Sequence, residues 1–413
     1  MRIRSLWVSN FKSFRELRVD HLGNFTVLVG ANASGKSNFV QIFRFLRDIA
    51  NHGLVNAVSL QGGADYLANA NVPPPRTLGI GLTYDPNLVL DLRETGIPVL
   101  IRIPEVAYEF SIRFPQKGGF RVCSDRLEKK LEFFEPAEKG AHKPRGEGKS
   151  ILSNRNGRVT YELYRPEGVP LKESDIIPSI LREERIGENS LLLESPFFGF
   201  AHRLDRFFDR IAIYNFDPRL PKNQISTTGK TDLEEDGSNL AIGLRPLLED
   251  REKRRKLSNL IKDLLPFIEE IEVEKVSDRS LLLKLKEIYS KGTFVPASFI
   301  SDGTLILIAI VVALYFENKS FIILEEPERS IHPLLIPRVV AMMKESSERK
   351  QLLVTTHHPE IVKNADPDDI LLSSRDREGF SNIVRPAEKE AVKTFLRQEI
   401  GIDELFRNDL LGI

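Results

Sequence analysis

The sequence predicts an α/β protein with a mixed sheet, an antiparallel β subdomain and an inserted helical lobe. A glycine-rich loop lies between a strand-like apolar run and an amphipathic helix, within residues 25–46. After residue 300, helices alternate with strands as in the second half of a parallel sheet. Between these ends, strand-like alternation surrounds a helical stretch at about residues 238–271. We therefore expect both ends of the chain to form one α/β domain, with an insertion between them.

The loop GANASGKS, residues 30–37, fits the pattern G-x-x-x-x-G-K-[ST] at every fixed position. Residues 25–29 are typical of a buried strand and residues 38–46 of a helix, which is the context that the pattern requires. The glycines let backbone N–H groups converge on phosphate oxygens, and the helix N-terminus adds a positive dipole. We expect Lys36 to reach the β- and γ-phosphates of a nucleoside triphosphate and Ser37 to bind Mg²⁺. The alternative is a glycine turn that happens to precede a lysine.

Composition limits the class of protein. The chain has 413 residues, 41% of them hydrophobic, enough for two domains or for one domain with a large insertion. Its 59 basic and 59 acidic side chains cancel, so a contact with DNA must use a local patch. The single cysteine, Cys123, suits a reducing cytosol, and the start of the chain does not read as a signal peptide. The longest apolar run, residues 305–314, is shorter than the roughly 20 residues of a membrane span, so we expect a cytoplasmic protein with no membrane segment.

Two glutamates follow the apolar run at residues 321–324, which is typical of a buried strand. In a parallel sheet the carboxyl ends of the strands line the ligand crevice. Beside a phosphate loop, Glu325 would bind the Mg²⁺ shell through water, and Glu326 would orient or deprotonate the attacking water. The alternative is a pair of solvated acids at the end of a strand.

Two further segments are candidates for contacts with phosphate. The apolar run 352–354 ends in His357 and His358; a histidine at this edge can hydrogen-bond a γ-phosphate, although His358 also fits an ordinary loop residue. Ser301 is placed as the N-cap of a long apolar helix and is followed by Gly303. The free N–H groups and the dipole of that helix can point at an anion. The alternative interpretation is an ordinary capped helix of the core with no ligand.

Taken together, these segments resemble the ABC-type ATPases of the branch that includes SMC proteins, Rad50, RecF and the OLD-like ATPases. Their order along the chain matches: phosphate loop, long middle, signature, acidic strand and switch histidine. SNFKSF at residues 9–14 resembles the opening strand of SMC-type heads, and SDGT at residues 301–304 resembles a variant signature motif. The resemblance implies a P-loop NTPase head that binds ATP with Mg²⁺ and hydrolyses it.

The resemblance also implies residue roles. The phosphate loop would supply the nucleotide contacts, namely Gly30, Asn32, Ser34, Gly35, Lys36, Ser37 and Asn38. Ser301 and Gly303 match signature positions that contact the γ-phosphate of ATP bound to a second protomer. Ser37 and Glu325 match the metal ligands, and Glu326 and His357 match the catalytic acid and the switch histidine.

The chain departs from the family pattern at three points. Glu325 replaces the usual Asp, Asp302 takes the place of a signature glycine, and the glutamine that completes the Mg²⁺ shell is not evident, with Gln61 as a candidate. These departures predict slow turnover and leave nucleotide binding in place.

Lys36 and Glu325 lie roughly 290 residues apart, which implies an insertion. We expect residues 1–115 to form the N-terminal part of the ATPase head, residues 116–298 an inserted strand and helix lobe, and residues 299–413 the C-terminal part of the head. Within the insertion, the glycine- and lysine-rich segment 137–150 is expected to be a loop. No heptad pattern is sustained over three or four heptads, which excludes a long coiled-coil arm.

The resemblance implies an ATP-driven switch that closes as a head-to-tail homodimer through an ATP sandwich. The closed state would control DNA binding or a separately encoded effector nuclease, in anti-phage defence. The alternative is a RecF-like DNA-repair ATPase, for which the basic cluster at residues 251–256 could contact phosphates or form a solvated helix face. The inserted lobe, the SMC-like opening and the SDGT form disfavour a transporter subunit.

Overall fold

The computed structural model describes residues 2–86, 88–93, 97–116, 118–136, 142–155, 157–176, 186–194 and 204–386. These residues form two compact units. Unit 1 comprises the described residues of 2–23, 33–211 and 374–384, and unit 2 those of 24–32, 212–373 and 385–386. The chain passes from unit 2 into unit 1 between Asn32 and Ala33, inside the glycine-rich loop. The predicted division at residues 115 and 298 stays a prediction.

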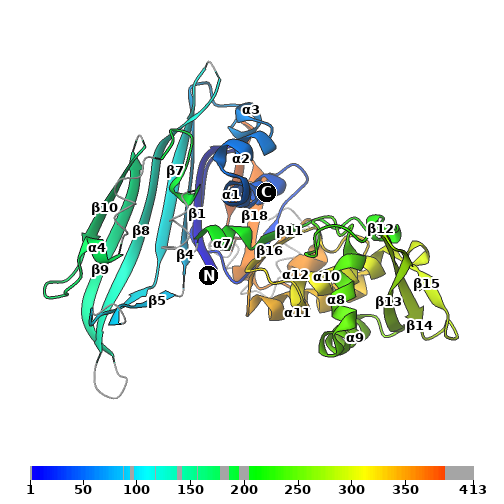
Figure 1. Cartoon of the computed structure of the whole chain (residues 1–413). Coiled ribbons are helices and arrows are strands. Elements are labelled where there is room, and N and C mark those ends of the chain that lie inside the picture. The colour runs from blue at the N-terminus through cyan, green and yellow to red at the C-terminus, as the bar shows by residue number, and fades with distance from the viewer. Residues whose placement is uncertain are drawn as a thin grey trace, which may run out of the picture. The chain divides into compact units, whose positions relative to one another are not determined.

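Unit 1 is built on an antiparallel sheet of nine strands within the described residues (Figure 1). Seven of them follow the order β10-β9-β8-β7-β4-β1-β2, and β6 pairs with both β5 and β8. The strands of this unit are β1 Arg2–Phe11, β2 Phe14–Val19, β4 Arg76–Asp85, β5 Leu88–Asp91, β6 Leu100–Ile103, β7 Val106–Phe114, β8 Arg121–Pro136, β9 His142–Arg155, β10 Arg158–Tyr164 and, beside β2, β19 Ser381–Val384.

The sheet of unit 1 buries one face. In β7 the side chains of Val106, Tyr108 and Phe110 are buried while the residues between them are more exposed, as expected for a strand with one covered face. The helices of this unit are α1 Lys36–His52, α2 Leu54–Leu60, α3 Ala64–Leu67, α4 Glu173–Ile176 and α7 Leu204–Asp209. The rings of Phe11 in β1 and Phe45 in α1 lie 6.1 Å apart, so the apolar stripe of α1 packs against β1.

The prediction of a loop at residues 137–150 is wrong from residue 142 onward, because these residues belong to the strand β9. β9 pairs along β8, with Lys143 opposite Glu135. Gly146 has φ +128° and lies at a shift in the register, where the strand bends as in a β-bulge. Backbone hydrogen bonds to β8 therefore fix a strand in a segment whose composition is typical of a loop; residues 137–141 lie outside the described residues.

Unit 2 contains the parallel sheet that the end of the chain predicts. Its strands follow the order β11-β16-β17-β3-β18, and β17 is parallel to both β16 and β3. Every residue of β3 is buried, as expected for a strand covered on both faces. The strands of this unit are β3 Phe25–Val29, β11 Ile211–Tyr214, β12 Ile225–Ser226, β13 Ile268–Ser277, β14 Ser280–Glu287, β15 Phe294–Pro296, β16 Phe321–Glu325, β17 Gln351–Thr356 and β18 Ile370–Arg375.

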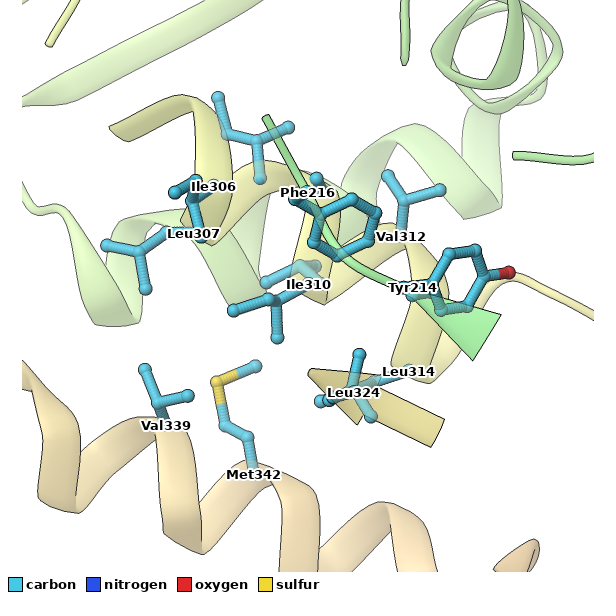
Figure 2. Close-up of a cluster of buried hydrophobic side chains, with 14 of the residues drawn as sticks. Tyr214, Phe216, Ile306, Leu307, Ile310, Val312, Leu314, Leu324, Val339 and Met342 are labelled. Atoms are coloured by element: carbon cyan, nitrogen blue, oxygen red, sulfur yellow. The ribbon is translucent and has the colours of Figure 1, made fainter. Parts of the chain in front are cut away.

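The core of unit 2 surrounds one apolar helix. In α10 every residue from Thr304 to Leu314 is buried, which explains a helix that is apolar on all sides. Figure 2 shows Ile310 of this helix between Phe216 and the side chain of Met342. The helices of this unit are α8 Leu240–Glu249, α9 Arg251–Leu264, α10 Asp302–Tyr315, α11 Ile336–Ser347 and α12 Pro359–Lys363. Within the described ranges, no helix is long and apolar enough to cross a membrane.

The helical stretch predicted at about residues 238–271 corresponds to α8, α9 and the start of β13. The strands β12, β14 and β13 form a small sheet in that order, and β15 pairs with β14. Asp250 caps α9, because its carboxylate accepts hydrogen bonds from the backbone N–H groups of Glu252 and Lys253. Two helices and a small antiparallel sheet thus come from the part of the chain that was expected to be inserted.

Candidate functional site

The glycine-rich loop has a backbone suited to an anion. It follows Val29, the last residue of β3, and ends where α1 begins at Lys36. Ala33 and Gly35 have φ angles of +64° and +115°, and alternating left-handed residues of this kind make backbone nests that bind anions. A non-glycine residue in that region costs about 1–2 kcal/mol, which a ligand site can explain. The side chain of Lys36 is buried and that of Ser37 is exposed.

Hydroxyl groups from outside the loop hold its end in place within unit 1. Asn38 donates from Nδ2 to Ser13 Oγ at 2.7 Å, and Ser381 Oγ donates to the same oxygen at 2.8 Å. The backbone N–H of Ser381 donates to the carbonyl of Ser13 at 2.9 Å. Sequence reasoning missed Ser381, which lies in β19; the SNFKSF segment pointed to Ser13 only as part of an opening strand.

Gly35 lies against Ser381, and this contact explains why glycine is required. A Cβ at residue 35 would be 2.3 Å from Ser381 Oγ and 2.7 Å from Ser381 Cβ. Gly35→Ala is therefore expected to displace the loop and to weaken ATP binding at least tenfold, as measured by calorimetry. Gly168→Ala is the matched control, because Gly168 also has a positive φ, +82°, but a Cβ there has nothing within 4 Å.

The control separates backbone strain from the collision. Gly168→Ala is expected to lower the free energy of unfolding by about 1–2 kcal/mol and to leave ATP affinity within twofold. Equal ATP affinities for the two variants would contradict the role assigned to the contact between Gly35 and Ser381.

Three neighbouring strands of unit 2 bring candidate residues to one edge of the parallel sheet. Glu325 in β16 pairs with Thr355, and Thr356 in β17 pairs with Val29 in β3. The carboxyl ends of the three strands therefore lie side by side. Glu326, His357 and Gly30 are the residues that follow them, so this edge carries the acids, the histidine and the start of the glycine-rich loop.

Glu326 and His357 are in direct contact. His357 Nδ1 lies 3.1 Å from Glu326 Oε1, and both side chains are partly exposed. Glu326 has φ +47°, a strained value for this residue type, and its N–H donates to the carbonyl of Thr355 at 2.9 Å. The hydrogen bond to Thr355 in β17 therefore holds Glu326 in a strained backbone conformation, in which its carboxylate lies beside His357.

A third acid in the same loop was not among the predicted catalytic or metal-binding residues. Glu328 is buried and accepts a hydrogen bond from Thr356 Oγ1, which in turn accepts one from the N–H of His358 at 2.9 Å. Burial raises the pKa of Glu328. Glu328 thus ties the loop after β16 to the end of β17. His358 serves as the N-cap of α12, and its ring nitrogen accepts a hydrogen bond from the N–H of Glu360.

The predicted signature residues lie at the start of α10. Ser301 is the N-cap, and its Oγ accepts a hydrogen bond from the N–H of Thr304 at 3.2 Å. A Cβ at Gly303 would be 2.5 Å from the carbonyl oxygen of Ser330. Glycine therefore lets the first turn of α10 pack against the loop that carries Glu326.

A cavity opens beside the N-terminus of α1 in unit 1. It has a volume of about 690 Å³, in the range of small-molecule sites, and Lys12, Asn38, Tyr66 and Arg375 are among the residues that line it. Burial lowers the pKa of Lys12. Gln61 also lines it, and its Nε2 donates to Asp48 Oδ2 at 3.4 Å; its expected role in the Mg²⁺ shell stays a prediction.

Comparison with known families identifies one that spans most of the chain. Residues 25–363 match the family described as "AAA domain, putative AbiEii toxin, Type IV TA system". This range begins at β3 and ends in α12, so it includes the glycine-rich loop, the predicted signature segment, β16 with its two glutamates, and His357.

The chain is also similar to individual proteins. The DNA replication and repair protein RecF of Nostoc punctiforme is 27% identical over 96 residues, which are 23% of this chain and about a quarter, 24%, of RecF. An SMC head solved with the C-winged helix domain of ScpA is 18% identical, with a TM-score of 0.50 over 93% of this chain and 98% of that chain. An SMC head from Pyrococcus furiosus, solved with an extended coiled coil and the C-terminal domain of ScpA, is 17% identical, with a TM-score of 0.48 over 96% of this chain and 99% of that chain.

Proposed function

The chain belongs to this AAA-domain family and is an ABC-type ATPase of the SMC and RecF branch, and from that premise we propose that it is an ATP-driven switch that closes as a head-to-tail homodimer. The observation that carries the proposal is the contact between Glu326 and His357 at the sheet edge where β3 enters the glycine-rich loop. An acid and a histidine at this edge suit the hydrolysis of a phosphoanhydride.

The glycine-rich loop would bind the triphosphate. Its N–H groups and the dipole of α1 would face the phosphates, with the ammonium of Lys36 on the β- and γ-phosphates. The exposed hydroxyl of Ser37 and the carboxylate of Glu325 are hard oxygen donors of the kind that Mg²⁺ prefers, and Mg²⁺ commonly keeps several waters besides them. Bound there, Mg²⁺ would neutralise charge that develops on the phosphates.

Glu326 would act as the general base. Its carboxylate would orient a water for attack on the γ-phosphate and take up a proton from it. His357 would fix the carboxylate through Nδ1 while its other ring nitrogen stays available for the γ-phosphate. Thr356 and Glu328 would hold the histidine loop in register with the acidic loop.

The cavity beside α1 would receive the base and ribose. It combines polar side chains with the ring of Tyr66, which is 73% exposed and can stack on a flat ligand. Asn38 belongs both to this cavity and to the first turn of α1, so the cavity lies next to the segment that would bind phosphate.

Closure would add the signature residues of a second copy. Ser301 and Gly303 would meet the γ-phosphate of ATP bound to the other protomer, so each ATP would be buried between two chains. Phe299 and Leu334 flank this region and are 80% and 81% exposed, and large exposed apolar side chains are typical of an interaction surface.

Light scattering tests the assembly. In the Glu326→Gln background, ATP with Mg²⁺ is expected to convert the protein to a dimer, and ADP with Mg²⁺ is expected to leave it monomeric, because only the γ-phosphate reaches the opposing signature. Ser301→Arg is expected to block the dimer while the single chain keeps its ATP affinity within threefold. Ser277→Arg, at an exposed position of β13, is the matched control.

Two results would contradict the proposed ATP sandwich. A protein that hydrolyses ATP as a monomer at every concentration, or that forms the same dimer with Ser301→Arg, would leave a P-loop ATPase without an ATP sandwich.

We propose that the switch controls DNA binding or a separately encoded effector nuclease in anti-phage defence, which the description of the family as a putative toxin supports. The similarity to RecF favours a second candidate, a DNA-repair ATPase. In α9, Arg254 pairs with Glu270 and Lys256 lies over the rings of Tyr315 and Phe316, so part of its basic cluster is engaged within unit 2. ATP-dependent binding to duplex DNA by the purified chain would favour repair, whereas activation of a nuclease encoded beside it would favour defence.

A further inference from the structure

An ion pair lies at the start of the signature helix. Lys222 Nζ is 2.6 Å from Asp302 Oδ1, and the two side chains are 25% and 43% exposed. Lys222 ends the short 3₁₀ helix Leu220–Lys222, some 80 residues before Asp302 in the sequence. Asp302 stands between Ser301 and Gly303, at the position where the sequence departs from the signature glycine.

Asp302 creates an electrostatic conflict for the proposed assembly. A carboxylate at this position would face the γ-phosphate of ATP bound to a second copy of the chain. The repulsion between two anions grows as closure removes water from between them. A favourable contact with the helix dipole explains why an acid stabilises α10, but it does not remove this repulsion.

The surrounding charges favour neutralisation. Asp217 accepts hydrogen bonds from Arg219 Nε at 2.9 Å and from its Nη2 at 2.6 Å, and these bonds lower the pKa of Asp217 to about 2. Arg329 also acts on Asp217, and Arg219 acts on both Asp217 and Asp302. Lys222 is the cation that contacts Asp302 directly.

We propose that Lys222 is a positioning residue of the signature half-site, which neutralises Asp302 so that the N-terminus of α10 can accept the γ-phosphate of ATP bound to a second copy of this chain. This inference rests on the proposed ATP sandwich. Lys222 would thereby compensate for the missing glycine. The ion pair of Lys222 and Asp302 has no net charge, and neither does the glycine that Asp302 replaces.

If the ion pair between Lys222 and Asp302 had only a structural role, its loss would affect folding and not dimer closure. Partly exposed pairs contribute little to folding stability, so loss of Lys222 should change the unfolding midpoint only slightly. A large effect on closure with little effect on folding would therefore separate the positioning role from a structural one.

A double-mutant cycle in the Glu326→Gln background tests the proposal. With ATP and Mg²⁺, Lys222→Ala is expected to lower the dimer association constant at least tenfold, by light scattering, without changing the ATP affinity of the monomer. Asp302→Gly is expected to raise that constant, and Lys222→Ala combined with Asp302→Gly is expected to return it to within threefold of the parent. Lys230→Ala, which removes an exposed lysine from the same unit, is the control for the loss of one charge.

Two results would overturn the proposal: closure of Lys222→Ala as tight as that of the parent, or a double variant as weak as Lys222→Ala alone. Ser301→Arg, measured alongside, separates the causes. If Ser301→Arg blocks closure and Lys222→Ala does not, only the role of Lys222 fails. If Ser301→Arg also closes normally, both the sandwich and the role of Lys222 fail.

Discussion

Lys36→Ala is expected to abolish ATP binding, with a loss of at least 100-fold in affinity by calorimetry. The ammonium is the one side-chain cation of the glycine-rich loop, and the β- and γ-phosphates would face it at a position where its side chain is only 8% exposed. An ion pair is stronger where water is excluded, and the backbone N–H groups of the loop cannot supply a full charge. Lys143→Ala, at an exposed position of β9, is the matched control.

Thermal or urea unfolding gives an independent reading of the same variant. ATP at 100 times its dissociation constant stabilises a protein by about 2.7 kcal/mol, so the parent and Lys143→Ala should gain this amount and Lys36→Ala should gain none. Unchanged ATP affinity in Lys36→Ala, with the fold intact, would refute the assignment of the phosphate loop.

Glu326→Gln is expected to bind ATP within threefold of the parent and to hydrolyse it roughly 100- to 10,000-fold more slowly. The amide keeps the shape of the side chain but cannot take a proton from water. Because Glu326 is held at φ +47° by its bond to Thr355, the amide should occupy the same position beside His357.

Glu325→Gln is the informative comparison for this experiment. It should raise the Mg²⁺ concentration needed for half-maximal turnover, because it removes a charged ligand, whereas Glu326→Gln should be slow at every Mg²⁺ concentration. If turnover by Glu326→Gln matches that of the parent, the base lies elsewhere, and Glu325 becomes the first residue to examine.

The predicted ABC-ATPase head is confirmed, and the local patterns explain why it could be predicted. A five-residue apolar run predicts β3, and the glycine and lysine spacing predicts the loop before α1. A helix that contains ten consecutive apolar residues is expected to be buried, as α10 is. Each of these features depends on residues that are close in the sequence.

The features that escaped prediction depend on residues that are distant in the sequence. Ser13 and Ser381 meet through a hydrogen bond, and Lys222 and Asp302 meet through an ion pair. No local pattern in the sequence records either contact. The first part of β9, residues 142–150, was expected to be a loop because its glycines and lysines disfavour a strand, and its pairing with β8 overrides that preference. Glu326 likewise adopts a left-handed backbone that glutamate does not favour. Its hydrogen bond to Thr355 in β17, a distant part of the sequence, holds it there.

The place of β3 in its sheet has a consequence for how the protein is made. Val27 pairs with Val354 and with Ile370, roughly 330 residues later in the chain. A ribosome that adds about 5–20 residues per second needs roughly 17–70 s to pass from β3 to β18. Until β17 has been made, FTVLV, an apolar segment without charge, lacks both of the strands that pair with it in the folded protein. A truncated chain that ends before β17 should therefore aggregate through β3 more readily than the full chain does.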